Sequence, residues 1–258
     1  MERGEKNPKG GRISMILPKR EDALHKAQLF RLLTEILDSP ISQSLYFKGG
    51  TAAAMAGSLD RFSLDLDFDL KRGVNKIIID KNLKLIFKNL GYELKSQSKK
   101  TLFYVVKYEA AKNLRNTIKL SIFENQPKTN LYEPLYLKEI DRLCLIQTEG
   151  TMFANKLVAL TDRYKKRRVI AGRDLYDIHY FFLQGYRYSE VIIKERTGKL
   201  PQKYFQELIS FIEKKISEKI ISQDLSFLLP YKKFISIRKV IKKETVMFLK
   251  DEIKRLLV

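Results

Sequence analysis

Residues 46–69 read YFKGGTAAAMAGSLDRFSLDLDFD, and this stretch decides how the chain is interpreted. The pattern predicts a short strand, a Gly-Gly turn, a short helix and a second strand that carries three aspartates. Asp65, Asp67 and Asp69 alternate with apolar residues, so on a strand their carboxylates leave the same face. Because like charges at this spacing repel, the pattern indicates a divalent cation beside the glycine turn. A cation in that position is a way to handle a nucleoside triphosphate.

The aspartates suit magnesium, which takes hard oxygen ligands and commonly binds one or two carboxylates together with substrate phosphates. We expect Asp65 and Asp67 to hold Mg²⁺, with Mn²⁺ as an alternative ion. Asp69 lies about 6–7 Å further along the strand and is expected outside the metal shell. The competing interpretation is a solvated acidic strand face, which the depletion of aspartate in strands disfavours.

The glycine turn precedes the aspartates by about fifteen residues. Gly49 and Gly50 let the backbone approach a ligand closely, and the helix that begins at Thr51 offers unpaired amides to a phosphate. A plain turn is the alternative for the glycine pair taken alone. Lys48 is interpreted either as a charge on the strand face or as a phosphate contact.

Two polar residues share the predicted aspartate face, since Arg61 and Ser63 precede Asp65 at alternating positions. Arg61 could pair with the carboxylates structurally or hold a phosphate through two hydrogen bonds. Ser63 is either an ordinary strand residue or a hydroxyl beside the metal.

A second group of candidates lies downstream. Lys156 sits on or at the edge of the apolar face of a predicted helix, so it either reaches water or points into an interdomain cleft that binds triphosphate. Asp174 and Asp177 share one face of the next helix, where an acidic first turn is also ordinary. A basic run precedes that helix and could contact nucleic-acid phosphates; it comprises Arg163, Lys165, Lys166, Arg167 and Arg168.

Composition narrows the class of protein. The 258 residues carry a formal net charge of +20, which favours partners with phosphate backbones or anionic membrane surfaces. No apolar run approaches the roughly 20 residues that a membrane span needs. Of the two kinds of partner that the charge favours, we expect nucleic acid and no membrane. The single cysteine, Cys144, excludes an internal disulfide, which suits a reducing cytoplasm. Cys144 itself is expected to be buried. His25 and His179 are interpreted as packed residues, and no zinc site is expected.

The order of patterns predicts an α+β protein. Helices are expected over 21–37, 51–56 and 75–90, and strands at 46–47, 64–70, 101–108 and 117–123, the last two as a hairpin. Beyond residue 140 helical patterns dominate, over 141–164, 174–184, 188–195, 202–221 and 234–257. We therefore predict a flexible basic arm at 1–15, a core with a mixed sheet at 16–140 and a helical domain at 141–258.

The stretch YFKGGTAAAMAGSLDRFSLDLDF, followed by FANKLVALTDRY and GRDLYDIHYFF, resembles the AbiEii/AbiGii-type nucleotidyltransferases, the toxins of type IV toxin–antitoxin systems. The resemblance spans about residues 20 to 185. It implies the DNA polymerase β-type nucleotidyltransferase core, a helical C-terminal domain and Mg²⁺-dependent transfer of a nucleotide from an NTP. In some relatives the acceptor is the 3′ end of tRNA.

Carried over by residue, the resemblance gives particular positions particular roles. Gly49, Gly50 and Thr51 match the turn that cradles the nucleotide, Asp65 and Asp67 the metal carboxylates, and Ser63 the neighbouring serine. Lys156 matches the family lysine, and Asp174 or Asp177 the late acidic residue. The chain departs at a third carboxylate, because the strand expected to supply it offers Ser121, with Glu124 just beyond.

We therefore expect a nucleotidyltransferase that moves NMP to an RNA hydroxyl, with tRNA as the favoured acceptor and a cognate antitoxin as partner. Two alternatives stay open at this point. The acceptor could be a protein hydroxyl, either a target or Ser63 itself. The chain could also be an RNA-binding module whose metal site is inactive.

Overall fold

The structure is a computed structural model that describes residues 15–257, and a mixed seven-stranded sheet lies at its centre. Its strands are β1 (Leu45–Lys48), β2 (Leu66–Leu70), β3 (Glu93–Gln97), β4 (Leu102–Lys107), β5 (Thr117–Phe123), β6 (Tyr132–Leu137) and β7 (Arg142–Gln147). They are ordered β3-β4-β5-β2-β1-β7-β6. The pairs β2–β5 and β1–β7 are parallel, and the other neighbours are antiparallel.

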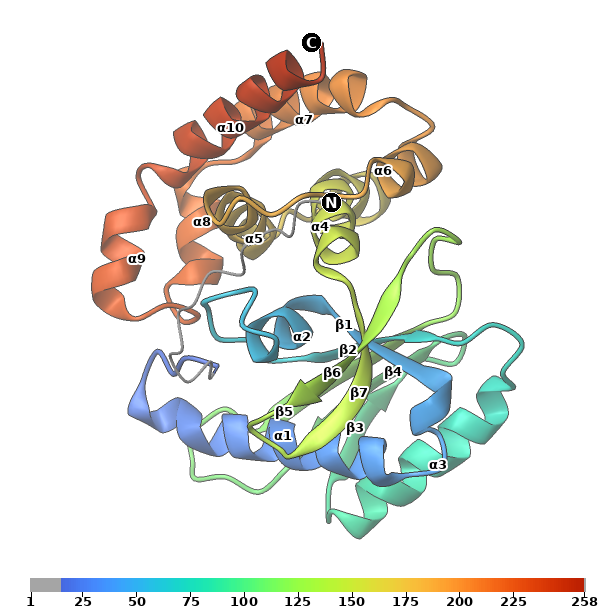
Figure 1. Ribbon diagram of the computed structural model, residues 1–258. Coiled ribbons are helices and arrows are strands. Elements are labelled where there is room, and N and C mark those ends of the chain that lie inside the picture. Colours follow the sequence, from blue (N-terminus) through green and yellow to red (C-terminus); the bar gives the residue numbers. More distant parts are fainter. Residues whose placement is uncertain (1–14, 258) are drawn as a thin grey trace.

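Helices cover both sides of this sheet (Figure 1). α1 (Ala23–Asp38) and α3 (Lys76–Asn89) lie on one face, and the short α2 (Gly49–Met55) lies on the other. Above α2 stands a group of helices: α4 (Glu149–Arg167), α5 (Gly172–Leu183), α6 (Glu190–Thr197), α7 (Pro201–Lys215), α8 (Glu218–Leu225), α9 (Tyr231–Ile237) and α10 (Ile241–Arg255). The predicted α+β class, with a mixed sheet flanked by helices and helices toward the C-terminus, is confirmed.

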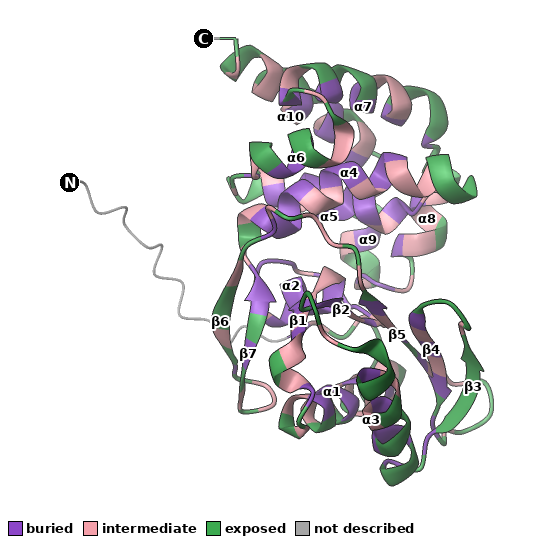
Figure 2. Ribbon diagram, turned by 90° about the vertical axis from the view of Figure 1, so that its right-hand side faces the viewer, coloured by how far each residue is buried: buried purple, intermediate pink, exposed green. Residues whose placement is uncertain are grey.

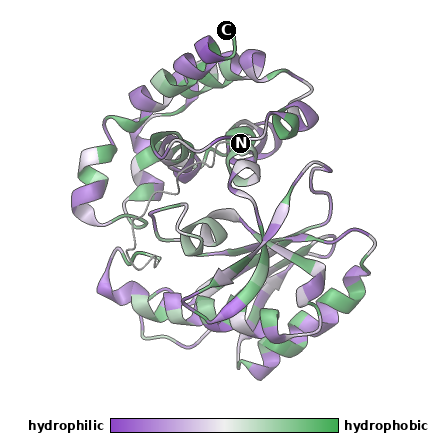
Figure 3. Cartoon of the chain, viewed as in Figure 1, coloured by the Kyte–Doolittle hydropathy of each residue, from purple (hydrophilic) through white to green (hydrophobic). Residues whose placement is uncertain are grey.

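One continuous apolar core runs from the sheet into the helices. The middle strands alternate as expected for a half-buried sheet, since Ile118, Leu120 and Ile122 on β5 are buried while their neighbours are not. Figure 2 shows the buried residues gathered along β1, β2, α4 and α5, with α3 and β3 more exposed. In Figure 3 the outer helices carry alternating bands of hydrophilic and hydrophobic residues, as amphipathic helices do.

The largest difference from the sequence-based prediction concerns residues 132–147. We expected no strand at Tyr132–Leu137, and we predicted a helix over 141–164, which is wrong in its first part because Arg142–Gln147 form β7. The predicted segment 202–221 is divided between α7 and α8, and 234–257 between α9 and α10. Because β7 belongs to the sheet, we propose that the helical part begins at Thr148, the residue that caps α4, and not at residue 141.

The basic arm predicted for 1–15 lies outside the described residues except for Met15. The side chain of Met15 is buried at 2% exposure, and its backbone N–H donates to Glu139. Met15 therefore belongs to the core, which corrects the predicted end of the arm. Between residues 15 and 257, none of the helices combines the length and apolar character that crossing a bilayer requires.

Candidate nucleotide and metal site

The three aspartates of residues 65–69 lie where β2 runs beside β1. Asp65 comes just before β2, and Asp67 and Asp69 lie on it. Within the antiparallel pair Lys48 is opposite Asp67, so the charged end of β1 meets the aspartate strand. The predicted alternation is present, because Leu66 and Phe68 between the aspartates are fully buried.

Asp69 is a structural residue. Its carboxylate has no solvent exposure and forms an ion pair with Lys48 at 2.5 Å. It also accepts hydrogen bonds from Gln147 at 2.7 Å, Tyr132 at 2.9 Å and Asn130 at 3.3 Å. Because these partners use both oxygens, Asp69 is not available to a metal, in agreement with its expected place outside the metal shell.

Asp65 and Asp67 differ from Asp69 in having no such partners. Between residues 15 and 257, neither carboxylate forms a hydrogen bond or an ion pair. Burial and the adjacent charge of Asp65 raise the pKa of Asp67, while Lys48, Lys156 and Arg173 act in the opposite direction. A cation bound between these two half-buried carboxylates would offset their mutual repulsion.

The glycine turn is shaped around this acid pair. Gly49, the first residue of α2, has φ = +83°, and a Cβ there would lie 2.7 Å from Oδ2 of Asp67. A Cβ on Gly50 would lie 2.6 Å from Arg61 and 3.0 Å from the buried hydroxyl of Ser63. The hydroxyl of Thr51 donates to the backbone carbonyl of Asp65, which ties the turn to the start of β2.

Arg61 takes the structural role and not that of a phosphate ligand. Its side chain is 1% exposed, and it donates to both oxygens of Asp177, at 2.6 Å from Nε and 2.8 Å from Nη2. The remaining Nη1 donates to the carbonyl of Phe62 at 2.9 Å. Of the two roles left open for Arg61, the contacts favour structural pairing with a carboxylate over phosphate binding, since all three nitrogens of the guanidinium are occupied by protein.

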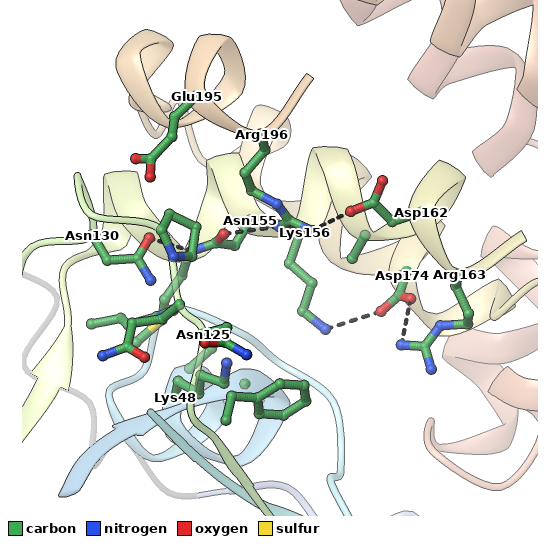
Figure 4. A pocket seen from close by; sticks show the side chains of 18 of the residues that line it. Lys48, Asn125, Asn130, Asn155, Lys156, Asp162, Arg163, Asp174, Glu195 and Arg196 are labelled. Atoms are coloured by element: carbon green, nitrogen blue, oxygen red, sulfur yellow. Dashed lines mark hydrogen bonds and ion pairs between the residues drawn. The ribbon is translucent and has the colours of Figure 1, made fainter. Parts of the chain in front are cut away.

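Lys156 projects from α4 toward the acids of α5 (Figure 4). Its Nζ lies 3.0 Å from Asp174 and 2.8 Å from Asp177, and its side chain remains 17% exposed. Arg163 binds the second oxygen of Asp174 at 3.1 Å. These cations outweigh the effect of burial and lower the pKa of Asp174 to about 2, so Asp174 is ionised at neutral pH.

Asp177 is fully buried and shared between Arg61 and Lys156. Both oxygens of Asp177, like both oxygens of Asp174, are in contact with protein cations, which favours a positioning role over a direct catalytic role for these acids. Burial opposes the charge of Lys156, but Asp177 and Asp174 raise its pKa, so the ammonium ion is retained. The two acids therefore hold a charged lysine in place.

An open pocket of about 640 Å³ lies between this end of the sheet and the helices. Lys48 and Gly49 line its sheet side, and Lys156, Arg163 and Asp174 line its helical side. Further polar lining residues are Asn125, Gln126, Asn130, Gln147, Asn155, Asp162, Lys166, Arg167, Glu195 and Arg196. The helical side of the pocket therefore carries Lys156 and Arg163, and the sheet side carries the glycine turn that lies against Asp67.

The carboxylate oxygens of Asp65 and Asp67 fit a magnesium ion that takes its other ligands from a substrate. No group of three or more His, Cys, Asp and Glu side chains within residues 15–257 is arranged to hold a metal alone. In the parallel pair β2–β5 the residue opposite Asp67 is Ser121, and Glu124 pairs with Lys76 at 3.3 Å. Two carboxylates and no third match an ion whose remaining ligands are phosphate oxygens and water.

Arg173 is the residue of this site that we did not expect from the sequence. Its charge acts on both Asp67 and Asp174, yet its guanidinium forms no hydrogen bond or ion pair within the described chain. Its position directly before Asp174 is the signal that could have indicated it.

The histidines and the cysteine are packed, as expected. His25 contacts the hydroxyl of Tyr108 at 2.7 Å and the carbonyl of Leu64 at 3.0 Å, and burial lowers its pKa to about 4. His179 is 2% exposed and contacts Glu244 at 2.7 Å. Burial raises the pKa of the Cys144 thiol to about 12.

Comparison with known proteins gives a family and a fold. The family model described as nucleotidyl transferase AbiEii toxin, type IV TA system, matches residues 31–230. A candidate nucleotidyltransferase from H. pylori shares 19% identity and a TM-score of 0.59 over 92% of this chain and 98% of its own. JHP933 from Helicobacter pylori shares 20% identity and a TM-score of 0.52 over 93% of this chain and 98% of its own. No curated protein sequence matches the chain.

Proposed function

The chain belongs to the AbiEii family of nucleotidyltransferase toxins from type IV toxin–antitoxin systems, and on this premise we propose that it transfers NMP from an NTP to an RNA hydroxyl. The acceptor that we favour is the 3′ end of tRNA. The attacking hydroxyl forms a bond to the α-phosphorus, the bond to the β-phosphate breaks, and pyrophosphate leaves while the hydroxyl proton passes to solvent.

One observation carries this proposal: Asp65 and Asp67 form no hydrogen bond or ion pair in the described chain, and Asp67 lies against Gly49, which itself lines the pocket. These two carboxylates would hold Mg²⁺, or Mn²⁺ in its place. The bound metal would neutralise triphosphate charge and make the α-phosphate a better electrophile. The protein contributes by keeping both acids free of internal ion pairs.

The cations around the pocket serve the phosphates. Lys156 faces the pocket with its charge retained, and Asp174 and Asp177 act as positioning residues that fix its amine. Lys48 and Arg173 add positive charge near Asp67. Positive groups held in place before the substrate arrives stabilise a developing phosphate charge without reorganisation.

The basic excess of the chain suits an RNA acceptor. Lys166 and Arg167, at the C-terminal end of α4, line the pocket, so an RNA strand could reach the site along positive charge. Ser63 is 7% exposed beside Gly50, which disfavours it as a self-acceptor. We further propose that the protein acts in the cytoplasm, where NTP and tRNA are present, and that a cognate antitoxin controls it.

A screen of four labelled NTPs against tRNA, other RNA and protein acceptors tests this proposal. We expect tRNA lengthened by one nucleotide, release of pyrophosphate, and loss of both when EDTA removes divalent ions. Labelled protein with unchanged RNA would contradict the RNA acceptor. RNA binding without pyrophosphate release would contradict the enzymatic function as a whole.

A further inference from the structure

Phe123 differs from the other phenylalanines of the chain in how much of its ring is exposed to solvent. All fifteen lie within the described residues; fourteen are buried or partly buried, whereas half of the surface of Phe123 is exposed to solvent. It is the last residue of β5 and lines the pocket. An apolar ring at a pocket wall is shielded from water when a ligand covers it, and that favours binding.

The ring is held in place beside the proposed phosphate-binding end. In the parallel pair β2–β5 Phe123 is in register with Asp69, so both lie on the same face of the sheet. The ammonium of Lys48 lies 3.8 Å from the ring centroid while it is ion-paired with Asp69. Lys48 therefore holds the ring, which is still half exposed, on the wall of the pocket that Gly49 also lines.

Two amides follow the ring along the pocket wall. Asn125 is exposed, and its side chain has no hydrogen-bond partner within residues 15–257. Gln126 donates from Nε2 to the carbonyl of Leu70 at 2.6 Å, while its Oε1 is buried without a partner. A buried oxygen without a partner is costly, so a ligand N–H that reaches Oε1 after a small movement of the side chain would gain a favourable hydrogen bond. Figure 4 shows Asn125 and Lys48 on the sheet side of the pocket, across from Lys156.

We propose that Phe123 is the stacking platform for the nucleobase of the NTP, with Asn125 and Gln126 at the edge of the base. Every nucleobase has a π-face that stacks on an aromatic ring, and side-chain amides pair with the donors and acceptors at its edge. The inference rests on the proposed function, because the same pocket contains Lys48 and Lys156 for the phosphates. A nucleotide placed in this way spans the pocket from ring to turn.

Binding of NTP without an RNA acceptor tests the proposal, with inorganic tripolyphosphate as the probe that lacks a base. Isothermal titration calorimetry with Ca²⁺, chosen to prevent turnover, would compare the wild type with Phe123→Leu, Phe123→Tyr and the control Leu143→Ala. Leu143 is another exposed apolar residue, on β7 and outside the pocket lining.

We expect Phe123→Leu to weaken NTP binding about tenfold, within the range of base–aromatic stacking, and to leave tripolyphosphate binding unchanged. Phe123→Tyr and Leu143→Ala should bind both probes as the wild type does. An equal loss for NTP and tripolyphosphate in Phe123→Leu would overturn the proposal, since the ring would then act only through Lys48.

Unchanged NTP binding in Phe123→Leu would also overturn the proposal. If RNA affinity alone fell in the same variant, the ring would stack the terminal base of the acceptor instead. Both results leave the proposed transferase function intact, because NTP still binds. Failure of that function would look different, since the wild type would bind neither NTP nor tripolyphosphate.

Discussion

At the scale of single residues, the site depends on which aspartate has partners in the protein. Asp69 is saturated by Lys48, Tyr132, Gln147 and Asn130, whereas Asp65 and Asp67 have none in the described chain. The sequence predicts three carboxylates on one face but does not tell them apart. The partners of Asp69 that follow it lie 61 to 78 residues away, which is why local spacing could not identify its role.

Gly49→Ala should abolish transfer although the protein still folds. The new Cβ would collide with Oδ2 of Asp67, and the left-handed backbone adds a strain of about 1–2 kcal/mol. Gly73→Ala is the matched control, because Gly73 has φ = +79° and a Cβ added there would meet no atom within 4 Å. Steady-state transfer rates would check this, and equal loss in both variants would show that strain alone is responsible.

His25 should make the protein less stable as the pH falls. The pKa of His25 is about 4 in the folded chain against an ordinary value of 6.5, so between these values the unfolded state binds the extra proton. The free energy of unfolding should therefore decrease as the pH falls from 6.5 to 4, by on the order of 3 kcal/mol from this residue. Urea denaturation across this pH range would measure the effect, and His25→Gln should flatten it. An equally steep pH dependence in His25→Gln would assign the effect to other groups.

At the scale of elements, the buried pair of Arg61 and Asp177 joins the loop before β2 to α5. The two residues are 116 positions apart in the sequence, and each is at most 1% exposed. The same network continues to Lys156 on α4, so three elements of the site are fixed by one set of charges. Breaking it should loosen the packing between the sheet and the helices.

Arg61→Met should destabilise the fold by about 3–5 kcal/mol, because it leaves part of a buried charge without its partner. Arg142→Met is the control, since Arg142 forms a similar two-bond pair with Asp38 on the surface, where solvent weakens such a pair and little stability should be lost. Chemical denaturation of both variants would measure the difference. Similar small losses would mean that the buried pair is not a structural link.

The elements also show what could be predicted from the sequence. The helices at 23–38 and 76–89, the β4–β5 hairpin and the aspartate strand follow from periodicity, and the structure contains them. The sequence does not predict β6, because Pro134 and Glu133 weaken its strand pattern, which is tolerated at the edge of the sheet. The apolar run of β7 merges with the pattern of α4, so periodicity favours a helix there. The bidentate partner of Arg61 could not be predicted, because it arises from tertiary contact.

At the scale of the whole molecule, the net charge of +20 is the property that favours an RNA partner. Lys166 and Arg167 bring part of this charge to the pocket. The pocket itself lies between the sheet and the helices, so it exists only because the two parts pack together.

The affinity for RNA should fall steeply as the salt concentration rises. The double variant Lys166→Glu/Arg167→Glu should reduce the slope of log affinity against log salt concentration by about two, one for each phosphate that is no longer neutralised. The control Lys250→Glu/Lys254→Glu changes the net charge equally on α10, away from the pocket lining. Filter binding to tRNA at several salt concentrations would measure both slopes. The same reduction in the control would mean that total charge, and not its position, governs RNA binding.

The most direct test of the site measures transfer of labelled NMP by Asp65→Asn and Asp67→Asn. The wild type and the surface variant Asp251→Asn are the proteins for comparison. Each of the first two substitutions keeps the size of the side chain and removes a carboxylate oxygen charge that the metal requires. We predict that both lose transfer while Asp251→Asn retains it, with all four proteins folded by circular dichroism. Transfer at the wild-type rate in either Asp65→Asn or Asp67→Asn would contradict the assignment of the metal carboxylates.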